Sequence, residues 1–595
     1  MASRLALLVF PAATLAQAPE VQAPRVADVP ALSGLTERWN AALPALDAPG
    51  FALAIVQDGK VLALDAFGVR NVAGDPATPD TCYYIASAAK PFTAMAACML
   101  AGEGKLDLDA PVKKVLPQLE LADEALTRTL ALRDLLCHRP GIASGAISQR
   151  DSYTGQIDDE LYFALLREAD IAHEVRYHNV HFTLAGRVIE AVSGQKWPEF
   201  LTQRLFVPAG MTRTTAYARE MYGKGEHAEP MLFVDSTWIR CPLVKTDRTM
   251  HAAGGIGTTA RDAARWLLLN TNRGELDGRR FLTEGMAREF FTQQSAHAPS
   301  GSIRIEEGFA LGWNTGKYRE ATRPYFFHGG GYVGAESYFC FLPKERIGVA
   351  VLVNTSGDLA TIVSIDVLDR LLGVKGQPDL LPTYAESARE RRAKNVFPDG
   401  ENPARSPDGL SAPAEKYAGR YTNADDGELE VLFEEGELKA RIGDLPFALF
   451  STGRDRFTAW VVPGMSHNGS FELTPAGDVA VVTLASSGPA SRFVRIGARD
   501  PGPAPKRNQV VDPDAYVGTY RAPEYTCDVR ARNGKLSVQM TTPPQPELEL
   551  EPTGTQHEFE VPSAGARFVF ELAGSTATGF TIHQGGATLE FARAP

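Results

Sequence analysis

The chain has 595 residues, a hydrophobic content of 44% and a formal net charge of −12. Such a length exceeds what one hydrophobic core supports, so we expect about two to four domains in a soluble, folded protein. The acidic balance excludes a nucleic-acid-binding surface, because phosphate contacts need clustered Lys and Arg.

The N-terminus has the pattern of a secretory signal peptide. The sequence MASRLALLVFPAATLAQAPE carries one Arg, an uncharged apolar run and then Ala16-Gln17-Ala18, which matches an A-x-A cleavage signal. The apolar run is shorter than the ~20 residues that a membrane-spanning helix needs. We therefore expect residues 1–18 to be removed and the mature protein to be periplasmic or secreted, without stable membrane insertion.

The cysteines and histidines do not predict a metal site. The six cysteines are an even number that an oxidising compartment could pair, but none forms a C-x-x-C pair. His173, His178 and His181 are close in sequence, yet no H-E-x-x-H accompanies them. We expect a protein without metal or cofactor.

The first two-thirds of the chain alternates strands and helices. GFALAIVQDGKVLALDAFG turns at Asp58-Gly59, which indicates a β-hairpin. SAAKPFTAMAACMLAGEG predicts a helix, and HFTLAGRVIEAVSG predicts a second one that ends at Gly194. AESYFCFLPKERIGVAVLVN indicates two strands around a short turn. We expect a domain of the α/β (α+β) class over residues 19–392.

The remainder of the chain has all-β character. Residues 393–412 are charged and rich in Pro and Gly, which predicts an exposed linker. Beyond them, short alternating runs and turns such as Asn533-Gly534 indicate strands. EKYAGRYTN and DAYVGTYRA share Tyr-x-Gly-x-Tyr, so we predict two copies of a small antiparallel β-barrel domain, residues 413–500 and 511–595.

Ser87 and Lys90 stand three residues apart at the start of the Ala-rich helix. That spacing places both side chains on one helical face. Pro91 predicts that the helix begins near Ser87, because proline is tolerated in a first turn. Lys90 can act as a base only when neutral, yet less than about 0.1% of a solvated lysine is neutral at pH 7. Burial or a neighbouring cation must therefore lower the pKa of Lys90.

Two later motifs support a catalytic role for Ser87 and Lys90. Tyr177-His178-Asn179 precedes the second helix, and His328-Gly329-Gly330-Gly331 leads into a strand. Isolated copies of the same patterns fall outside this order: Ser193-Gly194-Gln195-Lys196, Tyr421-Thr422-Asn423, His467-Asn468-Gly469 and His583-Gln584-Gly585. Each residue taken alone also has a structural interpretation: Tyr177 as a core residue, His328 as a buried histidine and Asn179 as a helix cap.

A serine–lysine pair, then Tyr-x-Asn, then a cation followed by glycine resembles the ordered pattern of serine β-lactamases and penicillin-binding proteins. The resemblance covers about the first 390 residues and includes GKLDLDAPVKKVLP, LRDLLCHRPGI and HAAGGIGTTARDAARWLLL. It implies an antiparallel sheet flanked by helices, plus a helical lobe, with the serine between them.

The resemblance also implies roles for individual residues. Ser87 would be the acylated nucleophile, Lys90 its base or proton relay and Tyr177 a second acid and base, with Asn179 contacting the substrate. His328 takes the place of the lysine of the Lys-Thr-Gly motif, a departure that favours peptidases and esterases over β-lactamases. Gly329, Gly330 and Gly331 would allow close approach of substrate, with the N–H groups of Ser87 and Gly331 forming an oxyanion hole.

The two barrels narrow the resemblance, since D-aminopeptidases of this group carry two lipocalin-like barrels after the catalytic domain. We therefore expect an exported serine peptidase or amidase that hydrolyses short peptides through an acyl-enzyme on Ser87. An esterase or β-lactamase of the same family is the first alternative, and a non-catalytic ligand sensor is the alternative of another class. A small peptide, ester or amide is the expected partner; nucleic acid is not, and homo-oligomerisation stays open.

Overall fold

The computed structural model describes residues 23–594, apart from residues 224, 320–322, 486–489, 498–512, 533–534, 543–546, 553–556, 562–565, 575 and 585–586. The chain divides into two compact units. One contains the residues up to Ser152 together with Ile157–Arg392, and the other contains Tyr153–Gln156 and the residues from Ala393 onward. Within the described part, no helix combines the length and apolar character needed to cross a membrane.

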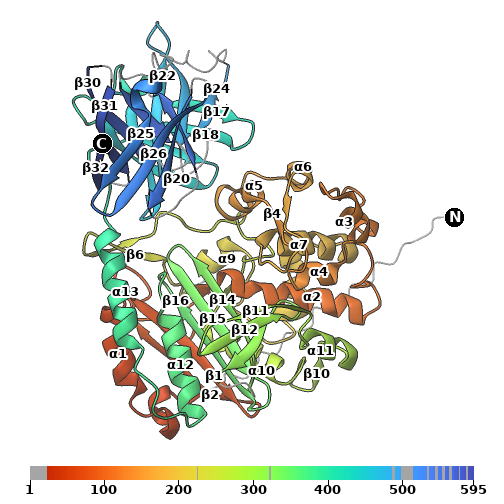
Figure 1. Ribbon diagram of the computed structural model, residues 1–595. Helices are drawn as coiled ribbons and strands as arrows, with labels where there is room; N and C mark the ends of the chain where they lie inside the picture. The colour runs from red at the N-terminus through yellow and green to blue at the C-terminus, as the bar shows by residue number, and fades with distance from the viewer. Residues whose placement is uncertain are drawn as a thin grey trace, which may run out of the picture. The chain divides into compact units, whose positions relative to one another are not determined.

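An eight-stranded antiparallel sheet forms the centre of the first unit (Figure 1). The hairpin expected at Asp58-Gly59 is present at one edge, as β1 and β2. In sheet order, the strands are β11 (Ser295–Ser300), β12 (Arg304–Phe309), β13 (Asn314–Tyr318), β14 (Pro324–Tyr332), β15 (Ala335–Leu342), β16 (Ile347–Val353), β1 (Gly50–Gln57) and β2 (Lys60–Gly68).

Helices cover both faces of this sheet because its central strands are apolar on both sides. Successive side chains of a strand point to opposite faces, and in β1 the odd-numbered Phe51, Leu53 and Ile55 belong to one buried cluster, whereas the even-numbered Ala52, Ala54 and Val56 belong to another. The odd face packs on α1 (Leu35–Ala45) and α12 (Leu359–Leu371). The even face packs on α10 (Ala260–Thr271).

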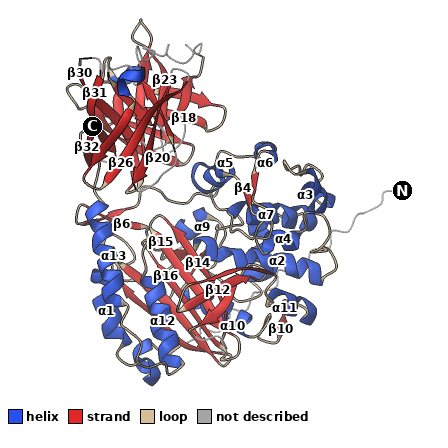
Figure 2. Cartoon of the chain, viewed as in Figure 1, coloured by secondary structure: helices blue, strands red, loops and turns tan. Residues whose placement is uncertain are grey.

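A helical lobe lies beside the sheet (Figure 2). Its central helices, α2 (Lys90–Gly102) and α7 (Asn179–Ser193), are both largely buried and pack against each other. Gly194 ends α7 in the left-handed conformation, at φ +70°, as its position after the apolar stripe predicts. The remaining helices of the structure, not all of them in this lobe, are α3 (Glu124–Thr129), α4 (Leu132–Leu136), α5 (Gly145–Gln149), α6 (Asp159–Arg167), α8 (Trp197–Leu201), α9 (Ala218–Gly223), α11 (Glu284–Phe290) and α13 (Leu381–Lys394). The short strands are β3 (Tyr83–Tyr84), β4 (Ile142–Ala143), β5 (Asp170–Ile171), β6 (Met231–Val234), β7 (Thr237–Arg240), β8 (Gly257–Thr258), β9 (Glu275–Leu276) and β10 (Arg279–Arg280).

The second unit contains two closed antiparallel barrels. The first consists of β17 (Gly419–Asn423), β18 (Gly427–Glu434), β19 (Glu437–Ile442), β20 (Leu445–Gly453), β21 (Arg456–Val462), β22 (Met465–Leu473), β23 (Val479–Ala485) and β24 (Ser491–Arg495). The second consists of β25 (Gly518–Ala522), β26 (Tyr525–Arg532), β27 (Lys535–Thr542), β28 (Leu548–Pro552), β29 (Glu558–Val561), β30 (Ala566–Ala573), β31 (Thr576–Gln584) and β32 (Ala587–Arg593). Closure of a barrel removes the exposed sheet edges that invite aggregation, and the predicted fold class is confirmed.

The internal repeat extends to individual hydrogen bonds. In the first barrel the hydroxyl of Tyr421 donates to the carbonyl of Tyr417 at 2.8 Å, and in the second Tyr520 donates to Tyr516 at 2.7 Å. These bonds explain the shared Tyr-x-Gly-x-Tyr as a structural signature of the barrels. Tyr421, the tyrosine of the isolated Tyr-x-Asn copy, belongs to that signature.

Residues 393–412 are mostly exposed or half-buried, and within them Asn402 hydrogen-bonds the backbone of Leu438 through both its oxygen and its nitrogen, at 2.9 and 2.8 Å. β26 and β27 pair as predicted, but the turn at Asn533-Gly534 lies outside the described residues, as do residues 1–18. All six cysteines are described, buried and free.

Candidate active site

Ser87 lies on a 3₁₀ turn, Ala86–Ala89, that leads directly into α2. The sequence predicts a helix that starts near Ser87; the regular α-helix starts at Lys90 instead, with Pro91 in its first turn. Among residues 81–100, all of them described, Ser87 alone is not buried. Ala86 before it has φ +46°, a left-handed conformation that costs an alanine about 1–2 kcal/mol. The turn thus presents one hydroxyl from an otherwise buried segment.

Lys90 is fully buried and its Nζ atom has three oxygen neighbours. They are Ser87 Oγ at 2.9 Å, Asn179 Oδ1 at 2.8 Å and the carbonyl of Ala253 at 2.7 Å. Burial holds the pKa of Lys90 well below its usual value. A neutral amine has two N–H groups and one lone pair; the two carbonyl oxygens can only accept, so the lone pair is left for the Ser87 hydroxyl proton. This is the arrangement that a general base requires.

Tyr177 lies against the same amine. Lys90 Nζ is 4.7 Å from the centroid of its ring, and its hydroxyl hydrogen-bonds the Ser87 side chain. Although 38% of Tyr177 is exposed, its hydroxyl is sheltered, and burial raises the pKa of Tyr177 above its usual value. Tyr177 is therefore protonated at neutral pH in the free protein and is not a core residue.

Asn179 is the first residue of α7, whereas the N-cap is His178, which makes no side-chain cap bond. The alternative of Asn179 as a helix cap is therefore wrong. Its amide oxygen is directed to Lys90 instead. Asn179 therefore binds the amine of Lys90 and does not cap α7.

His328, on β14, is 4% exposed, and its ring lies 6.1 Å from that of Tyr177 between centroids. Its Nδ1–H donates to the carbonyl of Gly329 at 2.7 Å, which leaves Nε2 unprotonated. Burial is the main cause that lowers the pKa of His328 to about 3. The sequence motif predicts a cation at this position; the structure corrects that prediction to a neutral imidazole.

The glycines after His328 have distinct surroundings. A Cβ on Gly330 would lie 2.0 Å from the carbonyl oxygen of Ile85, so the turn that carries Ser87 packs directly on β14 at this residue. A Cβ on Gly331 would meet nothing within 4 Å. β13 pairs with β14 only over residues 324–327, so among the described strands that edge of β14 is uncovered from His328 onward. An exposed strand edge offers backbone N–H and C=O groups to a substrate.

Sequence reasoning missed a pair of buried histidines beside Tyr177. The ring of His138 lies 4.6 Å from that of Tyr177, and its Nδ1 is 2.8 Å from Nδ1 of His181. The backbone N–H of Ile142 donates to His181 Nε2 at 2.9 Å, so His181 carries its proton on Nδ1 and donates it to His138. His138 was present in LRDLLCHRPGI, and its left-handed φ of +58° gave no signal in the sequence.

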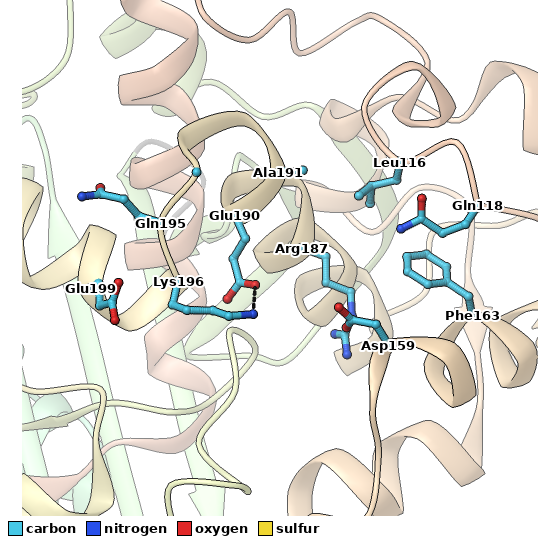
Figure 3. Close-up of a pocket in the computed structure, with 11 residues that line it drawn as sticks. Leu116, Gln118, Asp159, Phe163, Arg187, Glu190, Ala191, Gln195, Lys196 and Glu199 are labelled. Atoms are coloured by element: carbon cyan, nitrogen blue, oxygen red, sulfur yellow. Dashed lines mark hydrogen bonds and ion pairs between the residues drawn. The ribbon is translucent and has the colours of Figure 1, made fainter.

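The isolated Ser193-x-x-Lys196 copy shows what the motif looks like without this environment. Lys196 is 69% exposed and pairs with Glu190 at 3.0 Å, on the rim of a surface hollow (Figure 3). The carboxylate raises the pKa of Lys196. A lysine that stays charged cannot accept a proton from serine.

The fold and this cluster of side chains define a serine-hydrolase-like protein of the β-lactamase and penicillin-binding-protein class. A comparison with known families matches residues 37–372 to the family described as Beta-lactamase, and the chain belongs to that family. The resemblance predicted from the ordered motifs is thereby confirmed.

Individual relatives are distant. Penicillin-binding protein 4 of Amycolatopsis lactamdurans is 28% identical over 374 residues, which cover 60% of this chain and 93% of that protein. Protein flp of Staphylococcus aureus is 26% identical over 319 residues, 52% of this chain and 60% of that protein. The structure of an octameric penicillin-binding protein homologue from Pyrococcus abyssi superimposes with a TM-score of 0.52 at 23% identity, covering 77% of this chain and 99% of the other. This last likeness shows the fold alone.

Proposed function

We propose that the protein is a serine peptidase or amidase that hydrolyses short peptides through an acyl-enzyme on Ser87, in the manner of D-aminopeptidases. One observation carries the proposal: the buried amine of Lys90 has carbonyl oxygens for its two N–H groups and the Ser87 hydroxyl at its remaining position. Lys90 takes the proton of Ser87 as Oγ attacks the substrate carbonyl carbon.

The later steps use the remaining groups. The tetrahedral oxyanion is stabilised by backbone N–H groups, for which Ser87 and Gly331 are the candidates. Collapse breaks the scissile C–N bond, and the leaving amine takes a proton that Lys90 received, relayed by the Tyr177 hydroxyl. Water then adds to the ester, releases the acid and restores the Ser87 hydroxyl. No metal or cofactor is needed for these steps.

An ester or β-lactam substrate is the alternative, since the same acyl-enzyme forms and only the leaving group differs. The neutral state of His328 supports peptides and esters, because it supplies no positive charge for an anionic substrate. D-amino-acid anilides, short-chain esters and a cephalosporin, assayed side by side, would separate the three activities.

The test of the proposal is mass spectrometry after exposure to a serine-reactive fluorophosphonate. We expect one adduct, on Ser87, lost in Ser87→Ala and retained in the matched control Ser193→Ala. No adduct on Ser87 in a folded protein would favour the non-catalytic sensor and overturn the proposal.

Export and assembly are further parts of the proposal. The N-terminal pattern supports cleavage after Ala18, which N-terminal sequencing of protein recovered from cell fractions would test. Homo-oligomerisation is supported only by the octameric state of the Pyrococcus abyssi homologue. Light scattering coupled to gel filtration would measure the state of this chain.

A further inference from the structure

The carbonyl that holds Lys90 belongs to a tight turn, residues 251–255. The N–H groups of Gly254 and Gly255 both donate to the carbonyl of His251, at 2.9 and 2.6 Å. Two carbonyls of this turn are directed to α2: that of Ala252 accepts from Thr93 Oγ1 at 2.7 Å and that of Ala253 from Lys90 Nζ at 2.7 Å. The position of the turn therefore decides where one of the two N–H groups of a neutral Lys90 is directed.

The imidazole of His251 forms a hydrogen bond inside this turn. Its Nδ1 accepts the backbone N–H of Ala253 at 3.3 Å, so the proton of the neutral ring is on Nε2. Nε2 lies 3.1 Å from Ser152 Oγ and donates to it. The ring thus ties the residue that binds Lys90 to a second segment of the chain.

Ser152 is itself fixed through its carbonyl. That oxygen accepts from Lys245 Nζ at 2.7 Å and from the Tyr332 hydroxyl at 3.2 Å. Tyr332 is the last residue of β14, directly after the glycines of the site. The amine of Lys245 also lies 4.2 Å from the centroid of the Tyr332 ring. A chain of hydrogen bonds therefore connects the end of β14 to Lys90 through Ser152, His251 and Ala253.

We propose that His251 is a positioning residue for Lys90, which keeps the carbonyl of Ala253 within hydrogen-bonding distance of the amine and keeps the lone pair of the amine directed to Ser87. It touches neither Ser87 nor a substrate and acts through the backbone of Ala253. Its catalytic consequence rests on the function proposed above, whereas its geometric consequence does not.

The surroundings of His251 favour a neutral ring. Burial is the largest cause that holds the pKa of His251 well below its usual value, and the side chains of Lys245 and Arg187 act in the same direction. The ring therefore keeps one donor and one acceptor across the working pH range, which the hydrogen bonds to Ser152 and to the N–H of Ala253 require. Burial also lowers the pKa of Lys245, which donates to the carbonyl of Ser152, to about 7. The groups whose titration a pH profile would report are therefore Lys90 and Lys245 and not His251.

The test compares three variants. His251→Ala removes both hydrogen bonds, His251→Asn keeps an acceptor for the N–H of Ala253, and Ser152→Ala removes only the partner of Nε2. The matched control is His173→Asn, since His173 is an exposed histidine in the left-handed conformation, which asparagine tolerates. The readouts are the crystal structure of each variant and the pH dependence of fluorophosphonate labelling.

In His251→Ala we expect the hydrogen bond between Lys90 Nζ and the carbonyl of Ala253 to be lost. Labelling of Ser87 should slow on the order of 10- to 100-fold. The acidic limb of the labelling profile should move to higher pH, because water around the amine of Lys90 raises its pKa. His251→Asn should recover most of the rate, and Ser152→Ala should lie between. If His251→Ala keeps that hydrogen bond and the wild-type pH profile, the positioning role is overturned. If the bond is lost but wild-type protein is never labelled, the positioning role stands and the proposed hydrolase function fails.

Discussion

Asn179 accepts a hydrogen bond from Lys90 at 2.8 Å, although the two residues lie 89 positions apart in the chain. The contact joins the first residue of α7 to the first residue of α2. Its electrostatic character matters as much as its geometry, because an amide oxygen carries no net charge and stabilises a charged amine less than a carboxylate does. A carboxylate of the same shape would stabilise the ammonium form instead.

Replacing Asn179 with Asp should therefore prevent Lys90 from acting as a base, through the added negative charge and not through a change of shape. The new carboxylate raises the pKa of Lys90, so the neutral fraction at pH 7 falls. We expect a loss of kcat/KM on the order of 100-fold at pH 7, recovered in part as the pH rises. A pH–rate profile with an ester substrate would show the acidic limb displaced to higher pH. Asn423→Asp, in the isolated Tyr-x-Asn copy of the first barrel, is the control and should leave the profile unchanged.

The buried lysine also predicts how stability depends on pH. The folded-state pKa of Lys90 is lowered, so between that value and the unfolded-state value of about 10.4 the unfolded chain binds one more proton. That difference destabilises the fold at neutral pH and vanishes as the pH rises towards that value. Lys90→Met should raise Tm at pH 7 by about 2–5 °C, and the gain should shrink towards pH 10. A gain that is constant with pH would mean that Lys90 is charged in the folded state.

Some residues of the site could be predicted from the sequence, and others could not. Ser87, Lys90, Tyr177 and Asn179 stand in motifs whose order predicts that they meet, and the structure brings them together. The neutral state of His328 was not predictable, since it depends on burial by segments remote in sequence. The same holds for His138 and His181, 43 residues apart, and for the carbonyl of Ala253, 163 residues from Lys90.

Local backbone conformation was the second feature that the sequence did not predict. Ala86 and His138 adopt left-handed conformations, for which neither residue type gives a sequence signal. The fold class was predictable because alternation, hairpin turns and the repeated Tyr-x-Gly-x-Tyr are local patterns. The packing of residues 393–412 on the first barrel was not, because it depends on one asparagine bonding a distant backbone.

His328 should not titrate near neutral pH. Its pKa of about 3 predicts that the ring stays neutral at pH 5, where a solvated histidine is almost fully protonated. NMR of histidine-labelled protein, with the signal assigned through His328→Gln, would follow the ring directly. A His328 resonance that titrates between pH 6 and 7 would restore the cation that the motif predicts.

Gly330 should be far less tolerant of a side chain than its position on an uncovered strand edge implies. A Cβ there would lie 2.0 Å from the carbonyl of Ile85 and 2.5 Å from Ser337 Oγ, which itself donates to that carbonyl at 2.7 Å. Gly330→Ala must push the turn that carries Ser87 away from β14. We expect a destabilisation of about 1–3 kcal/mol and a larger loss of labelling at Ser87 than that destabilisation explains.

The control for Gly330→Ala is Gly285→Ala, in α11, where a Cβ meets nothing within 4 Å and alanine favours the helix.

The histidine pair predicts a selective rescue. His181→Leu would leave the buried N–H of Ile142 without its acceptor and cost about 1–3 kcal/mol. His181→Gln can offer an amide oxygen near the former Nε2 position, so we expect it to restore most of the melting temperature. It does not restore a donor at the Nδ1 position, so His138 loses the partner that fixes its ring beside Tyr177. Labelling of Ser87 should therefore stay below that of the wild type in His181→Gln while its stability recovers. Equal recovery of both quantities would show that the pair serves the fold alone.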